Sequence, residues 1–486
     1  MISGVYRRVS RLPTDHLLRR GWRYLRRISW VRQVIDRLLA LQPAVAISAA
    51  AVMPVVPAAG SANSKQFFVD LLERASTAAP TLEAVPRRVL LVNAGLAAGG
   101  AERQIVNTLN GLSRQSLENV SLLGEYLFES SERAFLLPEL RSGIAVEQVR
   151  RRTRFSGAGF TRIGPNVARL LGALPVQLAE EILDLAAEFR DRRPEVLHAW
   201  QDSTSIKCGI AAILAGVPRI VLGSRNLNPS NFAYHQPYMR LAYQALAERP
   251  NVVFINNSEA GAADFCRWLD LPRERFRVVR NGVALDDLKR DAEGAKILRT
   301  RENIPPDALV VGSIFRFWPE KRPLLWLEIA GRLLALRPGT HFLLVGDGPL
   351  RKQMSVFLAG IPHADHIHLI PPTNEVGRVL SAMNFFLLTS RFEGTPNVVL
   401  EAEWLGLPVL ALDAGGAAEA IEPHGNGIIC ENDSPETAVS HLCAMIDDRR
   451  WLGRAREIGP SFVRERFGFD RMISETMALY GYAVVA

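Results

Sequence analysis

Two glutamates flank the start of a predicted helix in residues 388–412, which read LTSRFEGTPNVVLEAEWLGLPVLAL. Glu393 lies in the loop before the helix, and Glu401 lies a little over one turn inside it. An E-x7-E spacing is by itself mostly coincidence, because glutamates are common in loops and helices. The pair becomes informative through the helix start that lies between the two carboxylates.

Thr395 and Pro396 predict where this helix begins. Threonine is a frequent N-cap residue, and proline favours the first helical position. The first free N–H groups, around Asn397 and Val398, then point out of the helix, and the positive end of its dipole favours an anion there. The segment therefore predicts an anion site at the helix start.

Two cations five residues apart, Arg316 and Lys321, lie in residues 311–323, VGSIFRFWPEKRP. They follow a predicted strand, in a loop that bends at Pro319. A pair of cations there can neutralise a diphosphate, and a guanidinium suits bidentate phosphate contact. A solvated pair at a strand end is the alternative. Nearby, residues 344–350 read LVGDGPL, a glycine turn that lets a ligand approach the backbone closely.

The first half of the chain offers a glycine loop and one histidine. Gly99 and Gly100, in NAGLAAGGAER, follow a predicted strand and open a helix, but their spacing is not the dinucleotide-binding G-x-G-x-x-G. His198, in EVLHAW, is expected at a strand end on the ligand-binding edge, with a satisfied core histidine as the alternative. The sequence contains no phosphate-binding P-loop and no Asp-x-Asp pair for a metal on a nucleotide diphosphate.

The elements that must position these residues follow from the hydrophobic pattern after about residue 86. Short apolar runs predict strands at 89–93, 195–200, 219–223, 252–256, 310–315, 342–345, 385–388 and 409–412. Amphipathic stretches predict helices at 101–112, 176–189, 259–269, 324–336 and 398–404. Such alternation indicates parallel sheets covered on both faces. The fold class is therefore α/β, with two doubly wound Rossmann-like domains and a ligand cleft between the carboxyl ends of their strands.

Composition and charge exclude several classes of protein. The chain has 486 residues, of which 48% are hydrophobic and 22% charged, values typical of a multidomain globular protein. Residues 1–40 hold ten arginines and two aspartates, and the remaining residues hold 48 basic and 48 acidic side chains. A basic patch for duplex nucleic acid is expected on the folded body, whereas here the excess positive charge is a terminal appendage, so no nucleic-acid partner is expected. Four dispersed cysteines fit a reducing compartment.

A short histidine cluster is the one candidate for metal binding. His363, His366 and His368 fall within six residues, but the stretch lacks the Cys or paired-helix spacing of zinc sites. We interpret it as a solvated loop that leads into a strand.

The basic N-terminal segment predicts an amphipathic helix. Between residues 18 and 38 apolar residues recur every three or four positions. Beside them lie Arg19, Arg20, Arg23, Arg26 and Arg27, a pattern suited to anionic lipid headgroups. A basic helix docked on the protein's own body is the alternative. Residues 38–64 carry no charge, but Pro43, Pro54 and Pro57 interrupt them. We therefore expect an Ala/Pro-rich linker rather than a spanning helix, and a cytoplasmic protein peripheral to the inner face of the membrane.

Taken in this order, the motifs resemble those of glycosyltransferase family 4, whose retaining enzymes have the two-domain GT-B fold. The resemblance covers roughly residues 86–486 and rests on Arg316 with Lys321, LVGDGP, SRFEGTPNVVLEA, GGAER and VRNGV. It implies that Arg316 and Lys321 hold the donor diphosphate and that Glu401 accepts the ribose hydroxyls. Glu393 would lie near the transferred sugar.

The same resemblance implies further contacts. The backbone from Thr395 through Pro396 and Asn397 to Val398 would touch sugar and phosphate, and Gly99 with Gly100 would close over the donor. His198 would lie near the reacting centre, so the expected catalytic residues are His198, Glu393, Arg316 and Lys321. Thr395 stands where the family commonly has an aromatic residue, which leaves the choice of sugar open.

The resemblance implies a retaining, metal-independent glycosyltransferase without a cofactor. It would move a hexose from a nucleoside-diphosphate sugar, with a UDP-sugar favoured, to a glycan or polyprenyl-linked acceptor in bacterial surface polysaccharide assembly. The alternatives are a sugar-nucleotide epimerase or phosphorylase on the same fold, or an inactive membrane-associated scaffold. The expected domains are a basic helix and linker at 1–85, an acceptor domain at 86–290, a nucleotide-sugar domain at 291–465 and a returning helix at 466–486.

Overall fold

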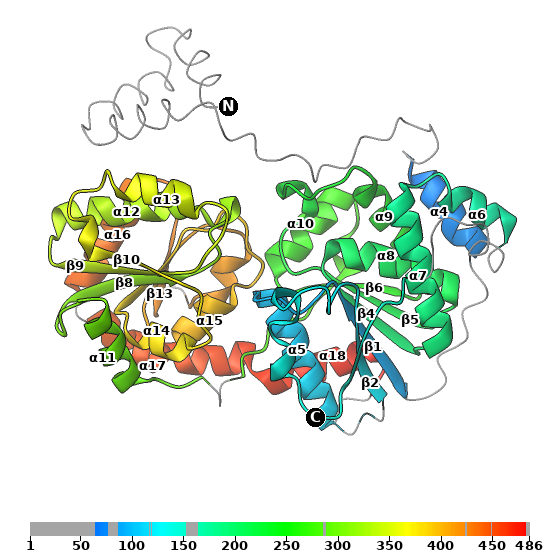
Figure 1. Cartoon of the computed structure of the whole chain (residues 1–486), viewed down its shortest axis with the longest axis horizontal. Helices are drawn as coiled ribbons and strands as arrows, with labels where there is room; N and C mark the ends of the chain where they lie inside the picture. The colour runs from blue at the N-terminus through cyan, green and yellow to red at the C-terminus, as the bar shows by residue number, and fades with distance from the viewer. Residues whose placement is uncertain are drawn as a thin grey trace, which may run out of the picture.

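The computed structural model describes residues 64–75, 86–115, 117, 119–151, 164–284, 288–422, 425–448 and 450–482. The predicted amphipathic helix of residues 1–40 and the predicted linker up to residue 63 lie outside the described residues. Within the described ranges, no helix is both long enough and apolar enough to cross a bilayer. The described chain folds into two lobes, each built on one parallel sheet (Figure 1).

In the described part of the first lobe, seven parallel strands form a sheet in the order β3-β2-β1-β4-β5-β6-β7. They are β1 (Arg88–Asn93), β2 (Asn119–Gly124), β3 (Ala145–Gln148), β4 (Val196–Trp200), β5 (Arg219–Gly223), β6 (Val252–Asn256) and β7 (Phe276–Val278). The central strand β4 is buried at every position, as expected for a strand covered on both faces. The strand order reverses direction between β1 and β4, which is where ligands bind in doubly wound sheets.

Helices cover both faces of this sheet (Figure 1). The helices of this lobe are α4 (Lys65–Ala75), α5 (Gly100–Arg114), α6 (Pro165–Leu171), α7 (Val176–Arg192), α8 (Asp202–Ala215), α9 (Tyr238–Leu246) and α10 (Glu259–Leu269), of which α4 packs on α6, α8 and α9. α4 lies in the stretch that we expected to be a linker. Its Phe67, Phe68, Leu71 and Leu72 are buried in the core of the first lobe, because their spacing places them on one face of the helix.

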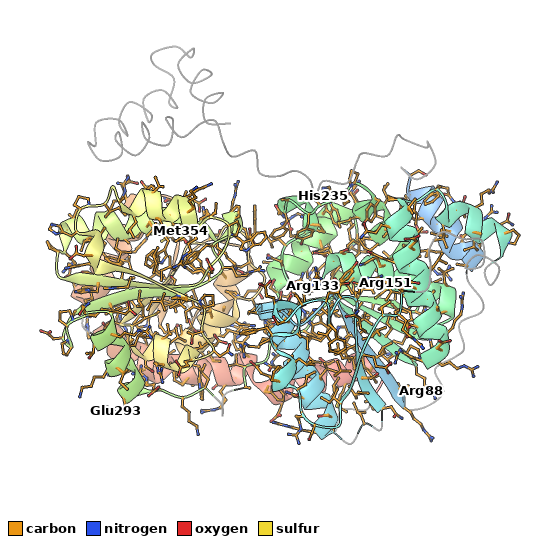
Figure 2. All side chains as sticks on the ribbon, viewed as in Figure 1. Arg88, Arg133, Arg151, His235, Glu293 and Met354 are labelled. Carbon is orange, nitrogen blue, oxygen red and sulfur yellow. The ribbon has the colours of Figure 1, made fainter. Side chains whose placement is uncertain are left out.

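The described part of the second lobe has six parallel strands in the order β10-β9-β8-β11-β12-β13. They are β8 (Leu309–Ile314), β9 (Thr340–Val345), β10 (Ile367–Ile370), β11 (Phe385–Leu388), β12 (Val409–Leu412) and β13 (Gly427–Cys430). The surrounding helices are α11 (Ala292–Arg301), α12 (Pro323–Leu336), α13 (Arg351–Leu358), α14 (Val376–Ser381), α15 (Asn397–Trp404) and α16 (Pro435–Asp447). Side chains fill the interior of both lobes (Figure 2).

The chain returns to the first lobe through its last two helices, drawn in red in Figure 1. α17 (Arg450–Phe467) packs against α15 of the second lobe, and α18 (Phe469–Tyr480) packs against α5 of the first. Tyr480 is fully buried in the first lobe's core. The two lobes are therefore joined twice, by the connection after β7 and by this returning pair of helices.

Candidate active site

The loop between β11 and α15 carries most of the residues expected to bind a donor. Pro396 has an extended backbone and caps α15, which begins at Asn397. The helix thus starts one residue after Pro396, the first helical position that the capping pattern predicted, and Thr395 is not its cap. The Thr395 hydroxyl instead donates to the backbone carbonyl of Asn257 in the first lobe, at 2.6 Å. The first N–H groups of α15 are therefore held at the boundary between the lobes.

Lys321 and Glu393 form an ion pair at the beginning of this loop. The Lys321 ammonium donates to Glu393 Oε1, and the two side chains are only 18% and 8% exposed. The backbone of Glu393 is fixed as well, since its N–H donates to the Ala414 carbonyl at 2.8 Å and its carbonyl accepts from the Gly416 N–H at 3.0 Å. The structure thus brings together the predicted phosphate-binding cation and the predicted sugar-side acid.

Arg316 lies apart from this pair. It is exposed just beyond the end of β8, and its guanidinium lies 5.7 Å from the centre of the Trp318 ring. The neighbouring Arg322 has a structural role, because it donates to the carbonyls of Thr389 and Ser390 at 2.7 and 2.9 Å. Arg322 therefore holds the end of β11 next to the short helical turn that ends at Lys321.

The predicted glycine loop of the first lobe contacts the start of α15 directly. The Asn397 side chain donates from Nδ2 to the Gly100 carbonyl at 3.0 Å, and a Cβ atom at Gly100 would lie 3.3 Å from that nitrogen. Asn397 Oδ1 accepts from Asn281 at 2.7 Å and from Gln104 at 3.2 Å. A glycine at position 100 allows this close approach of the two lobes.

A cavity of about 700 Å³ opens beside this contact, between α5 of the first lobe and the start of α14 in the second. Its lining includes Arg103, Gln104, Arg378, Asn397 and Glu401. Burial raises the pKa of Glu401, and the charge of Arg103 across the cavity opposes that shift. The cavity is large enough for a nucleotide-sized ligand and has both charged and polar walls.

Only some of the site residues predicted from the sequence line this cavity. Asn397 and Glu401 belong to its lining, whereas Arg316, Lys321 and Glu393 do not. Lys321 and Glu393 are instead linked to it by the loop that runs from Glu393 to Asn397. In the described chain, no cluster of three or more His, Cys, Asp or Glu residues is arranged to hold a metal ion.

His198 is not at a strand end, which corrects the expectation from the sequence. β4 continues to Trp200, so His198 lies in the middle of the strand and is fully buried. Its Nδ1 is 2.7 Å from the hydroxyl of Tyr480 on α18. Burial, with a smaller effect of Arg225, holds the pKa of His198 well below its usual value. His198 thus occupies a core position, with Nδ1 hydrogen-bonded and Nε2 without a partner among the described residues.

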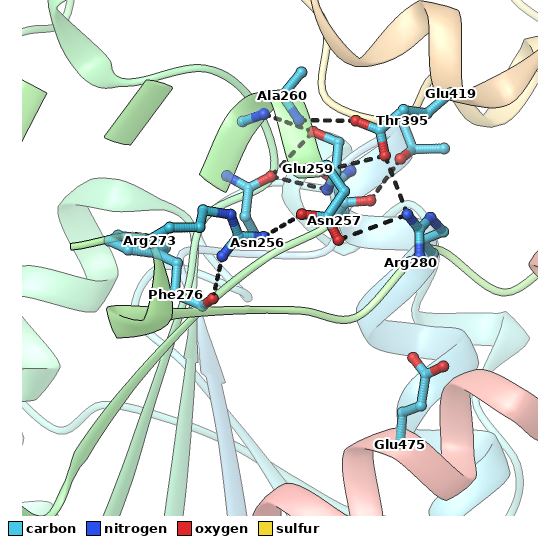
Figure 3. Close-up of polar contacts among 12 residues, drawn as sticks. Asn256, Asn257, Glu259, Ala260, Arg273, Phe276, Arg280, Thr395, Glu419 and Glu475 are labelled. Carbon is cyan, nitrogen blue, oxygen red and sulfur yellow. Dashed lines mark hydrogen bonds and ion pairs between the residues drawn. The ribbon is translucent and has the colours of Figure 1, made fainter. Parts of the chain in front are cut away.

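A polar network across the lobes was not predicted from the sequence (Figure 3). Glu419 of the second lobe accepts from the backbone N–H groups of Glu259 and Ala260 at 3.0 and 2.8 Å, at the start of α10. Arg280 lies 3.5 Å from Glu419 and 3.7 Å from Glu259. A carboxylate at a helix start is stabilised by the helix dipole. The network therefore holds the two lobes together beside the Thr395–Asn257 contact.

Family models match both lobes. The model described as Glycosyltransferase Family 4 matches residues 98–287, and the model described as Glycosyl transferases group 1 matches residues 295–460. Two doubly wound lobes with a donor-sized cavity between them define the GT-B class of glycosyltransferases. The chain belongs to glycosyltransferase family 4, and the enzyme is a glycosyltransferase.

Individual relatives agree with this assignment. The Vi polysaccharide biosynthesis protein VipC/TviE of Salmonella typhi is 32% identical over 405 residues, which cover 79% of this chain and 70% of that protein. An Escherichia coli UDP-Gal:alpha-D-GlcNAc-diphosphoundecaprenol alpha-1,3-galactosyltransferase is 23% identical, with 72% and 88% covered. Anabaena HepE, solved with UDP and glucose, shares the fold with a TM-score of 0.65 at 18% identity, covering 82% of this chain and 100% of that one.

Proposed function

We propose that this glycosyltransferase moves a hexose from a UDP-sugar to a lipid-linked saccharide during assembly of a bacterial surface polysaccharide. The names of two relatives, one a Vi polysaccharide biosynthesis protein and the other a transferase for a diphosphoundecaprenol-linked sugar, support this acceptor class. Solved neighbours that hold UDP or UDP-glucose support the choice of donor.

The observation that carries the proposal is the position of Asn397. This residue starts α15, touches Gly100 of the other lobe and lines the cavity that also contains Glu401. In the proposed complex, the nucleoside occupies the cavity with its ribose hydroxyls on Glu401. The diphosphate lies on the backbone from Thr395 to Val398, where the helix dipole favours negative charge.

The sugar would then lie at the Lys321–Glu393 pair. In the reaction, the bond between the anomeric carbon and the phosphate oxygen breaks, and a bond from that carbon to the acceptor oxygen forms. Negative charge develops on the leaving diphosphate, and Lys321, Arg316 and the helix start stabilise it electrostatically. Because the acceptor hydroxyl attacks from the side of the departing phosphate, a phosphate oxygen takes its proton and the anomeric configuration is retained.

Metal independence is part of the same proposal. The sequence has no Asp-x-Asp pair, and two cations with a helix start supply positive charge for the leaving group. Lys321 can exchange its bond with Glu393 for one with a phosphate oxygen. Glu393 would then be free to contact a hydroxyl of the sugar.

A donor screen tests the function. Purified full-length protein is incubated with UDP-, GDP- and ADP-hexoses and a lipid-linked saccharide, with and without EDTA, and the product anomer is read by NMR. We expect transfer from a UDP-hexose, an unchanged rate in EDTA and an α-linked product from an α-linked donor. Loss of transfer in EDTA would disprove metal independence, and inversion at the anomeric carbon would disprove the retaining mechanism.

A further inference from the structure

Arg225 is a cation of the first lobe whose guanidinium is poorly satisfied. It lies two residues beyond the end of β5, at the edge of the sheet that faces the second lobe. Its Nε and Nη1 atoms are buried and have no hydrogen-bond partner among the described residues. A buried charged group without a partner is costly, so natural proteins rarely keep one without a reason.

Two neighbouring side chains share this property. The Arg225 guanidinium lies 3.9 Å from the centre of the Trp200 ring, and that ring lies 4.2 Å from the ring of His198. Trp200 Nε1 and His198 Nε2 are also buried without a partner in the described chain. Three residues in contact therefore leave four buried nitrogen atoms without a hydrogen-bond partner in the described chain.

The stack fixes the guanidinium in place. A cation over an indole ring is attracted by the ring's quadrupole, and Trp200 is itself only 1% exposed. The His198 ring, which packs against Trp200, is held by its hydrogen bond to Tyr480. Burial lowers the pKa of Arg225 to about 9, and the charge of Tyr480 offsets only part of that shift. The guanidinium is thus held rigidly before any ligand binds.

Arg225 lies next to the proposed sugar site. A Cβ atom at Gly394 would lie 2.7 Å from the Arg225 carbonyl, so the two backbones are in close contact across the lobes. Gly394 directly follows Glu393, which is paired with Lys321. The backbone of Arg225 therefore lies across from the sugar end of the site, on the lobe opposite to the proposed diphosphate contacts, and its guanidinium lies over Trp200 on the same lobe.

We propose that Arg225, backed by Trp200, binds an oxyanion carried by a substrate at the sugar end of the cleft. A guanidinium presents parallel N–H donors that match a carboxylate or a phosphate, and both groups supply the acceptors that this cluster lacks. The oxyanion is either an acidic group of the transferred sugar or an acidic group of the acceptor. The inference rests on the proposed function, because it takes the position of the sugar from it.

Binding measurements on four forms of the full chain test this site. They are the wild type, Arg225→Gln, Arg225→Lys and the control Arg277→Gln, which removes the same charge from an exposed position on β7. Calorimetry compares UDP-glucuronate with UDP-glucose in a donor arm. In an acceptor arm, D-glucuronate and inorganic phosphate are compared with D-glucose in the presence of saturating UDP.

We expect the wild type to bind an acidic probe at least about tenfold more tightly than glucose or UDP-glucose in one arm, and that arm identifies the source of the oxyanion. Arg225→Gln should remove this preference, Arg225→Lys should keep part of it, and Arg277→Gln should keep all of it. The proposal is overturned if the wild type shows no preference in either arm, or if Arg225→Gln retains it.

UDP binding distinguishes a wrong assignment of Arg225 from a wrong proposed function. UDP affinity should be the same in the wild type and in Arg225→Gln, because Arg225 is not among the residues that line the proposed nucleotide cavity. A wild type that fails to bind UDP contradicts the proposed function. If Arg225→Gln does not fold, the wild-type preference and its reduction in Arg225→Lys decide the question.

Discussion

Asn397 Nδ2 donates a hydrogen bond of 3.0 Å to the backbone carbonyl of Gly100, and this bond joins the start of α15 to the glycine loop of the opposite lobe. The same side chain accepts from Asn281 and Gln104, so one amide satisfies three partners in the first lobe. The residue that begins the proposed phosphate-binding helix therefore also contacts the opposite lobe.

Replacing this amide tests its double role. We expect Asn397→Ala to lower kcat/KM for the UDP-sugar by about tenfold or more. Loss of the Asn397 hydrogen bonds costs about 1–2 kcal/mol and misplaces the helix start. Steady-state kinetics at varied donor concentration measure the change. The exposed Asn119→Ala should behave like the wild type. Equal kcat/KM in the two variants would contradict a role for Asn397 in donor binding.

Lys321→Ala and Glu401→Ala should separate catalysis from binding. Lys321 is proposed to act on charge that develops in the transition state, so its loss should lower kcat by about a hundredfold or more. Glu401 is proposed to bind ribose in both states, so its loss should mainly raise KM for the donor. Transfer assays with the exposed Lys352→Ala as control measure both constants. Wild-type kinetics in both variants would remove the motif assignment.

The apolar pattern predicted the central strands other than β2 and missed the strands at the sheet edges. The predicted bounds of β5, β6, β11 and β12 agree with the structure, because each is a short apolar run between turn signals. β3 was missed, since its sequence AVEQ is short and partly exposed at a sheet edge. α8 was missed for the opposite reason: it is buried on nearly all sides and shows little helical periodicity.

The contacts between lobes could not be read from the sequence. Asn257 and Thr395 are 138 residues apart, and Glu259 and Glu419 are 160 apart, so no local pattern links them. The motif around Glu393 located the second lobe's loop, because its residues are consecutive. The first lobe's share of the site, including Arg225 and Asn257, depends on where strand ends meet in space.

The His198–Tyr480 hydrogen bond should contribute to stability rather than to catalysis. Tyr480→Phe leaves a buried imidazole nitrogen without its partner, and we expect it to lower the free energy of unfolding by about 1–3 kcal/mol. His198→Phe combined with Tyr480→Phe should cost less than the sum of the two single changes, because neither polar group is then left alone. Urea unfolding measures the cycle. Strict additivity would show that the two groups do not interact.

A cluster of histidines in the second lobe should make stability depend on pH. His341 in β9 is buried, its Nδ1 lies 3.1 Å from His368 Nε2, and its ring stacks 4.2 Å from that of His366. Burial and the charges of the two neighbouring histidines lower the pKa of His341 to about 4, from an ordinary value of 6.5. The folded state therefore binds fewer protons than the unfolded state between these pH values.

The direction in which stability changes with pH follows from this difference in bound protons. The contribution of His341 to the free energy of unfolding is fully present above pH 6.5 and is lost as the pH falls towards 4. The loss is about 3 kcal/mol at most. Unfolding in urea at pH 7.5 and pH 5 should show this loss in the wild type. His341→Phe should reduce the loss, whereas the exposed His363→Phe should not. The same pH dependence in all three proteins would contradict the assignment.

The N-terminal arginines give the last prediction, which concerns the proposed attachment to a membrane. Ten arginines and two aspartates within residues 1–40 account for the chain's entire net charge of +8, so removal of this segment leaves a neutral protein. Each basic residue near an anionic bilayer contributes about 1 kcal/mol, and salt screens that attraction. We expect the full chain to sediment with phosphatidylglycerol vesicles and to be released from them by about 0.5 M salt. It should not sediment with neutral phosphatidylcholine vesicles. A chain lacking residues 1–40 should remain in the supernatant with both kinds of vesicle. If it sediments with the anionic vesicles, the folded lobes themselves bind the membrane and the prediction is wrong.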